Sequence, residues 1–309
     1  MSDGDDRAAR CRPLGPYAAA ERRPGAASVG EVVGQLAGIL DDAGVPLPRD
    51  EARDLVAAML DVPRFWPSMN REASLDADCH RAALTAAARR ASGTPFAYAV
   101  GRAPFRHLSL DVDERVLIPR QETEVLVDLV LEATGGEGAL AVDVGTGSGA
   151  IALALATEGH FGRIIATDVS LGALEVAGRN TGLLAGALRC EVELRAGSLL
   201  APVAGERARV VVSNPPYIAY AEAAALPAGV RDWEPAVALF AGDNGMAAIG
   251  AIVRQAPGVL EPGGLLALEV DARRASLAAE LCMADDRYAD VRVRLDLTGR
   301  ERFVLARRA

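Results

Sequence analysis

The chain has 309 residues, half of them hydrophobic, which is enough for one large domain with its own core and a second, small one. Its formal net charge of −9 argues against a protein that clamps a long stretch of nucleic acid, because such proteins present a basic surface. All 33 basic residues are arginines, so no lysine is present to form a Schiff base with a substrate. No apolar run reaches the length of a membrane span, and the acidic N-terminus lacks the apolar segment of a signal peptide. A cytoplasmic protein is therefore expected.

The first part of the chain predicts a short leader and a small helical domain. Residues 1–27 are rich in Arg, Ala, Gly and Pro without periodicity and are predicted to be disordered. Ser28 is a good helix cap, and apolar residues recur at helical spacing after it, again over 51–60, and again over about 75–91. These segments predict a helical domain over residues 28–92.

The cysteines and histidines give no sign of a bonded framework or a metal centre. The four cysteines are far apart in the sequence, at Cys11, Cys79, Cys190 and Cys282. Because no two of them form a CxxC pair, free thiols are expected. The three histidines are equally scattered, so no metal site is expected.

The rest of the chain predicts a linking β-hairpin over 93–120 and an α/β domain over 121–309. Strands are expected at 140–144, 163–168, 191–195, 208–213, 263–270, 288–295 and 301–307, and helices at 148–158, 170–181, 246–259 and 272–283. This alternation indicates a doubly wound, mainly parallel sheet covered on both faces. Only three residues separate the last two strands, which should form an antiparallel hairpin.

A glycine-rich loop, Asp143-Val144-Gly145-Thr146-Gly147-Ser148-Gly149, follows the first of these strands. Ligands of doubly wound sheets bind beyond the carboxyl ends of the strands, and the glycines let a ligand approach the backbone. Asp168 ends the next strand, where its carboxylate could accept hydrogen bonds from ribose hydroxyls. The acidic residue before the glycines and the C-terminal hairpin favour S-adenosylmethionine over a dinucleotide.

Asn214-Pro215-Pro216-Tyr217 follows the apolar run 210–213. The prolines make a stiff turn rich in hydrogen-bond acceptors. The Asn214 side-chain oxygen and the Pro215 carbonyl could each accept one N–H of a planar NH2 group, and Tyr217 could stack on its face. The turn predicts methyl transfer to such a nitrogen, and does not by itself distinguish a glutamine amide from an adenine, cytosine or guanine amine.

Several blocks make residues 28–309 resemble the HemK/PrmC family of release-factor glutamine N5-methyltransferases. These blocks are Gly93-Thr94-Pro95-Phe96-Ala97-Tyr98, Leu117-Ile118-Pro119-Arg120 with Glu122-Thr123-Glu124, the glycine loop, Asn214-Pro215-Pro216-Tyr217-Ile218, the segment Arg231 to Leu239, and Asp296, Gly299 and Arg302 near the C-terminus. The resemblance implies a Rossmann-like class I S-adenosylmethionine-dependent methyltransferase domain with a seven-stranded sheet, and a helical domain that recognises the substrate.

The resemblance also implies an acceptor and a set of site residues. The acceptor is the glutamine of the Gly-Gly-Gln loop of peptide-chain release factors, and the enzyme is expected to be a monomer without stable nucleic-acid or membrane binding. The expected catalytic residues are Asn214, Pro215 and Tyr217. The expected cofactor-binding residues are Asp143, Gly145, Thr146, Gly147, Gly149, Asp168, Ser198 and Asn214. The expected substrate-binding residues are Asn214, Pro215, Pro216, Tyr217 and Arg120, with Thr123 near the junction.

Three departures from the family pattern leave other acceptors open. Ser198 replaces an acid common in relatives, Phe105-Arg106 replaces an aromatic pair, and Asp271 replaces the glycine of a Glu-x-Gly segment. The alternatives are an N-methyltransferase for a small-molecule amide, guanidine or amine, a nucleic-acid base N-methyltransferase, and a catalytically silent cofactor-binding module. The intact Asn-Pro-Pro-Tyr turn argues against the last, and the acidic charge argues against the base methyltransferase.

Overall fold

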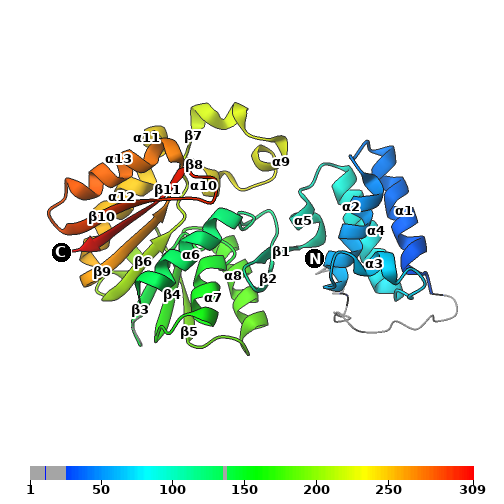
Figure 1. Cartoon of the computed structure of the whole chain (residues 1–309), viewed down its shortest axis with the longest axis horizontal. Helices are drawn as coiled ribbons and strands as arrows, with labels where there is room; N and C mark the ends of the chain where they lie inside the picture. The colour runs from blue at the N-terminus through cyan, green and yellow to red at the C-terminus, as the bar shows by residue number, and fades with distance from the viewer. Residues whose placement is uncertain (1–10, 12–25, 135–137) are drawn as a thin grey trace, which may run out of the picture. The chain divides into compact units, whose positions relative to one another are not determined.

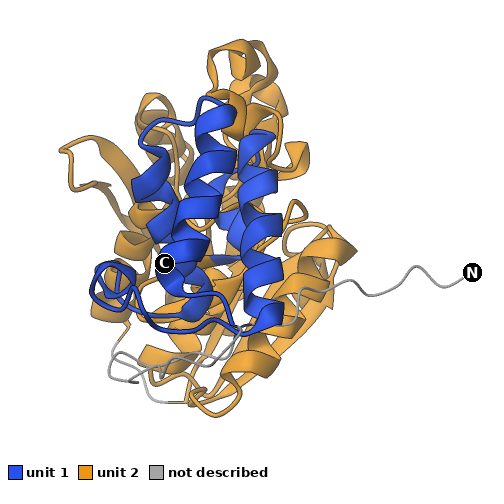
Figure 2. Ribbon diagram, turned by 90° about the vertical axis from the view of Figure 1, so that its right-hand side faces the viewer, with its two compact units in different colours: residues 1–102 blue, residues 103–309 orange. Residues whose placement is uncertain are grey.

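The computed structural model describes residue 11 and residues 26–134 and 138–309. The predicted leader therefore lies almost wholly outside the described residues. The chain divides into two compact units, residues 1–102 and residues 103–309 (Figure 2). Within the described residues, no helix is both long enough and apolar enough to cross a bilayer.

The first unit is helical. It contains α1 (Val29–Asp42), α2 (Pro48–Leu60), α3 (Trp66–Met69), α4 (Ala77–Ala91) and α5 (Phe96–Val100). Ser28 caps α1 as expected, because its hydroxyl accepts from the Glu31 N–H while the Glu31 carboxylate accepts from the Ser28 N–H. The buried core of the unit includes Leu36, Leu55 and Trp66. The sequence predicted the three long helices and missed α3 and α5, which are too short to show helical periodicity.

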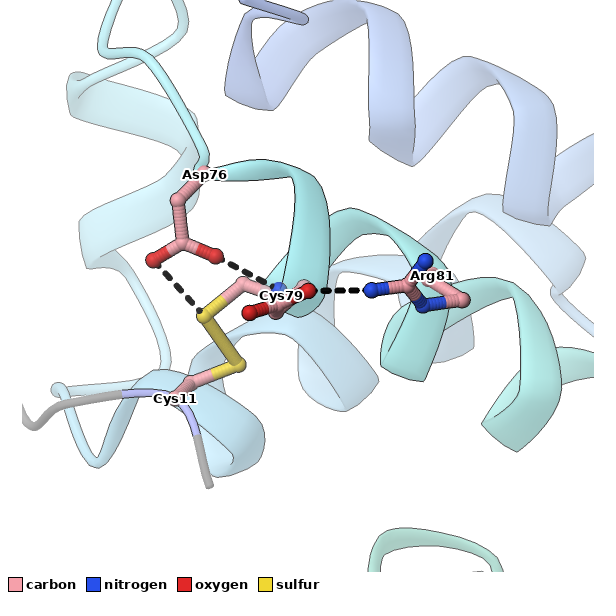
Figure 3. The surroundings of a disulfide bond; sticks show 5 residues. Cys11, Asp76, Cys79 and Arg81 are labelled. Atoms are coloured by element: carbon pink, nitrogen blue, oxygen red, sulfur yellow. Dashed lines mark hydrogen bonds and ion pairs between the residues drawn. A yellow bond between two sulfur atoms is a disulfide. The ribbon is translucent and has the colours of Figure 1, made fainter. Parts of the chain in front are cut away.

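A disulfide joins Cys11 to Cys79 near the start of α4, which corrects the expectation of free thiols (Figure 3). Both cysteines are buried in the core of the helical unit. Asp76 caps α4 by accepting a hydrogen bond from the Cys79 N–H at 2.7 Å, which fixes the backbone that carries this cysteine. The two residues are 68 positions apart, and sequence spacing does not report such a contact. Cys190 and Cys282 are free thiols.

The second unit is built on one seven-stranded sheet (Figure 1). Its strands are β3 (Leu140–Val144), β4 (Arg163–Asp168), β5 (Glu191–Ala196), β6 (Ala208–Ser213), β9 (Leu260–Glu269), β10 (Tyr288–Leu295) and β11 (Glu301–Arg308). They lie in the order β10-β11-β9-β6-β3-β4-β5. Strands β5, β4, β3, β6 and β9 run parallel, whereas β11 pairs antiparallel with both β9 and β10. The predicted parallel sheet and its C-terminal hairpin are both confirmed.

Helices cover both faces of this sheet. On one face pack α6 (Gln121–Ala133), α7 (Ala150–Glu158) and α8 (Leu171–Leu184), and on the other pack α12 (Ala247–Gln255) and α13 (Ala272–Met283). Successive strand residues alternate between the two cores, as with Ala141 and Val142 on β3. The short hairpin β1 (Arg102–Phe105) and β2 (Leu108–Asp111) precedes α6, and the 3-10 turns η1 (Ala201–Val203) and η3 (Ala256–Gly258) lie before β6 and β9.

A long excursion separates β6 from α12. It contains β7 (Ile218–Ala219), η2 (Tyr220–Ala225), α9 (Ala228–Arg231), α10 (Ala236–Leu239), β8 (Phe240–Ala241) and α11 (Gly242–Gly245). Strand β7 pairs in parallel with β8, so the chain that leaves β6 and the chain that returns to α12 are tied together at their bases. None of these elements was predicted, because each has six residues or fewer.

Candidate active site

A cavity opens at the point where the strand order reverses, between β3 and β6. Gly145 and Gly147 line it at φ values of +74° and +56°, where glycine is favoured. Asp168 also lines the cavity, and its carboxylate accepts hydrogen bonds from the N–H groups of Gly147 at 3.0 Å and Ser170 at 2.9 Å. The carboxylate of Asp168 therefore holds the glycine loop and still has lone pairs for a ligand.

The remaining wall of this cavity is largely apolar. It includes Val116, Leu117, Val144, Leu199, Val237, Ala238, Ala248 and Ile252. Ser198 adds a hydroxyl on the side that follows β5, and Asn214 lines the cavity from the end of β6. A slot with apolar faces and few polar groups suits a flat heterocycle held at its edge.

Asp143, Thr146 and Gly149 belong to the loop but do not line the cavity. The Asp143 side chain is fully buried, and its Oδ2 accepts hydrogen bonds from the Thr146 hydroxyl at 2.6 Å and the Ala152 N–H at 3.2 Å. Burial raises the pKa of Asp143 to about 7, against the effect of these two hydrogen bonds. Asp143 thus braces the loop and the start of α7 from below.

A second, smaller cavity lies on the other side of the Asn-Pro-Pro-Tyr turn at residues 214–217, which the sequence predicts to be catalytic and which is named the catalytic turn below. Its lining comprises Leu117, Arg120, Asn214, Pro215, Tyr217, Ile218, Val230, Ala238 and Leu239. Leu117, Asn214, Pro215 and Ala238 line both cavities and form the wall between them. Pro216 lines only the first cavity, whereas Tyr217 and Arg120 line only the second. Asn214 and Pro215 are thus the turn residues that reach both cavities.

The Asn214 amide is the first member of a chain of hydrogen bonds. Its Nδ2 donates to the Thr123 hydroxyl at 3.0 Å, and this hydroxyl donates to Glu269 Oε2 at 2.7 Å. Thr123 and Glu269 are buried, with exposed fractions of 5% and 1%. Burial is the largest influence on Glu269 and raises its pKa to about 7.

Arg120 forms an ion pair with Glu234 at 2.5 Å. The Glu234 side chain is only 2% exposed, and its Oε2 has no hydrogen-bond partner among the described residues. This pair joins the segment before α6 to the excursion that follows the catalytic turn. The two residues are 114 positions apart in separate blocks of the sequence, so no local pattern pairs them.

Gly245, which no motif singled out, determines how closely the excursion can pack on the catalytic turn. It has φ +89°, and a Cβ atom placed there would lie 2.1 Å from the Tyr217 carbonyl oxygen and 2.3 Å from Arg274 Nε. Arg274 of α13 donates to the Asn244 carbonyl at 2.7 Å and to Glu222 at 2.9 Å, so these hydrogen bonds hold the Arg274 side chain against the Gly245 Cα.

We expect Gly245→Ala to lower the free energy of unfolding by about 2–4 kcal/mol, because it combines backbone strain with a steric overlap. Urea denaturation of the two proteins measures this change. Gly229→Ala is the matched control, since Gly229 lies on α9 in the same excursion with nothing near its Cβ position. Equal losses for the two variants would contradict the packing argument.

The three departures from the family pattern have local structural roles. Arg106 lies in the β1–β2 turn and pairs with Glu158 and Asp128, both at 2.7 Å, which ties the hairpin to α7 and α6. Asp271 caps α13 by accepting from the Arg273 N–H. Ser198 lines the first cavity.

Comparisons with known proteins identify the class of this fold. Residues 31–101 match the model of the PrmC N-terminal domain, and residues 120–227 match that of the methyltransferase small domain. The catalytic domain of hMettl16, solved in complex with the MAT2A 3'UTR hairpin 6, shares the fold with a TM-score of 0.51 at 18% identity, over 75% of this chain and 81% of that one. The sheet order, the glycine loop and these matches define a Rossmann-like methyltransferase with an N-terminal helical domain.

Two relatives place the chain more narrowly. It is 41% identical to the release factor glutamine methyltransferase of Moorella thermoacetica, over 91% of this chain and 97% of the relative. It is 38% identical to the enzyme of the same name from Deinococcus radiodurans, over 90% and 98%. The chain belongs to the release factor glutamine methyltransferase family.

Proposed function

We propose that this protein transfers a methyl group from S-adenosylmethionine to the side-chain amide nitrogen (N5) of a glutamine in a peptide-chain release factor, within its Gly-Gly-Gln loop. The observation that carries the proposal is the position of Asn214 and Pro215 in the wall between the two cavities. Methyl transfer needs a donor and an acceptor that meet, and these two residues are within reach of both. The names of relatives that align over nearly their whole length support a release factor as the acceptor.

The first cavity fits the proposed cofactor. Gly145 and Gly147 would hold its amino-acid end, Asp168 would accept from its ribose hydroxyls, and Ser198 would meet the adenine edge within the apolar slot. When bound, S-adenosylmethionine supplies an electrophilic methyl group on a sulfonium. Asp143, Thr146 and Gly149 would act by shaping the loop, because they do not line the cavity.

The second cavity fits the side chain of a glutamine. Its apolar residues suit the two methylene groups, and the Asn214 oxygen and the Pro215 carbonyl would accept the two N–H bonds of the amide. These acceptors orient the nitrogen lone pair and stabilise positive charge that develops on it. Transfer would replace the C–S bond of the sulfonium with an N–C bond, and the methylated nitrogen held by Asn214 and Pro215 would then lose a proton to solvent. Such a nitrogen is acidic, so no strong base is needed.

A methyl-transfer assay with labelled S-adenosylmethionine tests the proposal. The acceptors are a purified release factor and the same factor with the glutamine of its Gly-Gly-Gln loop replaced by alanine. Label is expected on the intact factor alone, and at that glutamine by peptide mass spectrometry. Absence of label on the intact factor, while the enzyme binds S-adenosylhomocysteine, would refute the release-factor acceptor and direct the search to small-molecule amides and amines.

A further inference from the structure

The Asn214 amide has two ends of similar shape and opposite hydrogen-bonding character. If the oxygen faces the acceptor cavity, it accepts from the incoming NH2 group. If the amide turns over, its own NH2 group faces the NH2 of the acceptor, and the two donors oppose each other. The orientation of this one amide therefore decides whether the acceptor nitrogen is held.

Thr123 and Glu269 determine that orientation. An ionised carboxylate has no hydrogen to donate, so the Thr123 hydroxyl must donate its single hydrogen to Glu269, which it does at 2.7 Å. The Thr123 oxygen then offers only lone pairs toward Asn214. Only the NH2 end of the Asn214 amide can pair with it, and that end does so at 3.0 Å.

Asn214 and Glu269 come together because both lie at the carboxyl ends of neighbouring strands, and Thr123 of α6 contacts both of them. Asn214 follows β6, Glu269 ends β9, and these strands are parallel neighbours in which Ser213 pairs with Leu268. Thr123 lies in the first turn of α6, and Arg120 is the N-cap residue of the same helix. Thr123 and Glu269 are both buried, so water does not compete for the hydrogen bond between them, whereas the bond from Asn214 to Thr123 is partly buried.

We propose that Glu269, acting through the Thr123 hydroxyl, is a positioning residue that holds the Asn214 oxygen toward the acceptor nitrogen. The proposal rests on the proposed transfer to an amide nitrogen. It assigns Thr123 and Glu269 to orientation of the catalytic turn, and neither is required to touch the acceptor or the cofactor.

The arrangement makes orientation depend on pH. Protonated Glu269 carries a hydrogen that it can donate in a hydrogen bond to the Thr123 oxygen. The Thr123 hydroxyl can then donate its own hydrogen bond to the oxygen of the Asn214 amide, which turns the amide over. Arg302 and Arg120 face Glu269 and favour its ionised form, whereas Glu122 and the burial of the carboxyl oppose it; Tyr217 lies beside it. Since burial dominates and places the pKa at about 7, the productive orientation is present above that pH and is lost as the pH falls through it.

Side-chain amide NMR tests the orientation without any acceptor. The chain has four asparagines, so ¹⁵N-asparagine labelling gives four amide pairs, and the Asn214 pair is identified by its absence in Asn214→Ala. With S-adenosylhomocysteine present, we expect this pair to shift with a midpoint near pH 7. The shift should vanish in Glu269→Gln and in Thr123→Val. A wild-type midpoint that persists in Glu269→Gln would overturn the proposal.

Kinetics test its consequence. Thr123→Val should lower kcat by about 10- to 100-fold with little change in S-adenosylhomocysteine affinity, and Thr123→Ser should restore most of the rate. Thr134→Val is the matched control, because Thr134 is similarly buried at the other end of α6 and its hydroxyl donates to the Val130 carbonyl of the same helix. Equal rates for the Val and Ser variants at position 123 would refute the role. If wild-type enzyme leaves the release factor unlabelled, the proposed function fails, while the NMR titration still decides the orientation.

Discussion

Asn214→Ala is expected to lower kcat for glutamine methylation by about 100- to 1,000-fold, the range found when one preorganised polar contact to a transition state is removed. The side-chain oxygen is lost from the wall between the two cavities, and the amide nitrogen of the acceptor is left free to rotate. Because the cofactor cavity keeps Asp168 and the glycine loop, S-adenosylhomocysteine affinity should fall by less than about tenfold. Steady-state kinetics and calorimetry measure the two quantities.

Asn70→Ala provides the matched control for this substitution. The Asn70 amide is half-buried and bonds the Trp66 carbonyl at 2.9 Å within the helical unit, far along the chain from the catalytic turn. Its kcat should stay near the wild-type value. A large loss of cofactor affinity in Asn214→Ala, with kcat preserved at saturation, would show that Asn214 serves the cofactor and would contradict its assignment to the acceptor.

Asp168→Ala is expected to weaken S-adenosylhomocysteine binding by about 100-fold, because hydrogen bonds to a charged group are each worth about 1.5–3 kcal/mol. The carboxylate accepts from Gly147 and Ser170, so its removal both loosens the glycine loop and deletes the acceptors proposed for the ribose. Asp168→Asn keeps the shape and one oxygen, and should lose less. Isothermal titration calorimetry gives the affinities directly.

Asp76→Ala controls for the loss of a capping carboxylate as such. Asp76 also accepts a backbone N–H, that of Cys79, but it caps α4 in the helical unit and lines neither cavity. Its variant should lose stability and keep cofactor affinity. If Asp168→Ala bound the cofactor as tightly as the wild type, the ribose assignment would be wrong.

Sequence predicted the centre of the sheet well because the central strands are buried on both faces and appear as apolar runs, such as 208–213. The excursion after β6 was not predicted, since two-residue strands and four-residue helices carry too little periodicity to recognise. Its shape depends on contacts such as that between Gly245 and the Tyr217 carbonyl, which join residues far apart in the chain.

For the site, too, the sequence predicted residues that lie in local motifs and missed contacts between residues far apart in the chain. Gly145, Gly147, Asp168 and Asn214 stood out because each sits in a local motif at a strand end. The bond between Asn214 and Thr123 spans 91 residues, and that between Thr123 and Glu269 spans 146, so no local pattern could join them. The disulfide between Cys11 and Cys79 escaped prediction for the same reason.

The ion pair between Arg120 and Glu234 constrains how this family can diverge. Losing Arg120 leaves the buried carboxylate of Glu234 unpaired, which costs about 3–5 kcal/mol, whereas replacing both residues with apolar ones of similar volume can be nearly neutral. A homologue that acquires a substitution at one of these two positions should therefore soon acquire a compensating substitution at the other. Across homologues, we expect the two positions to covary, with arginine and glutamate retained or lost together.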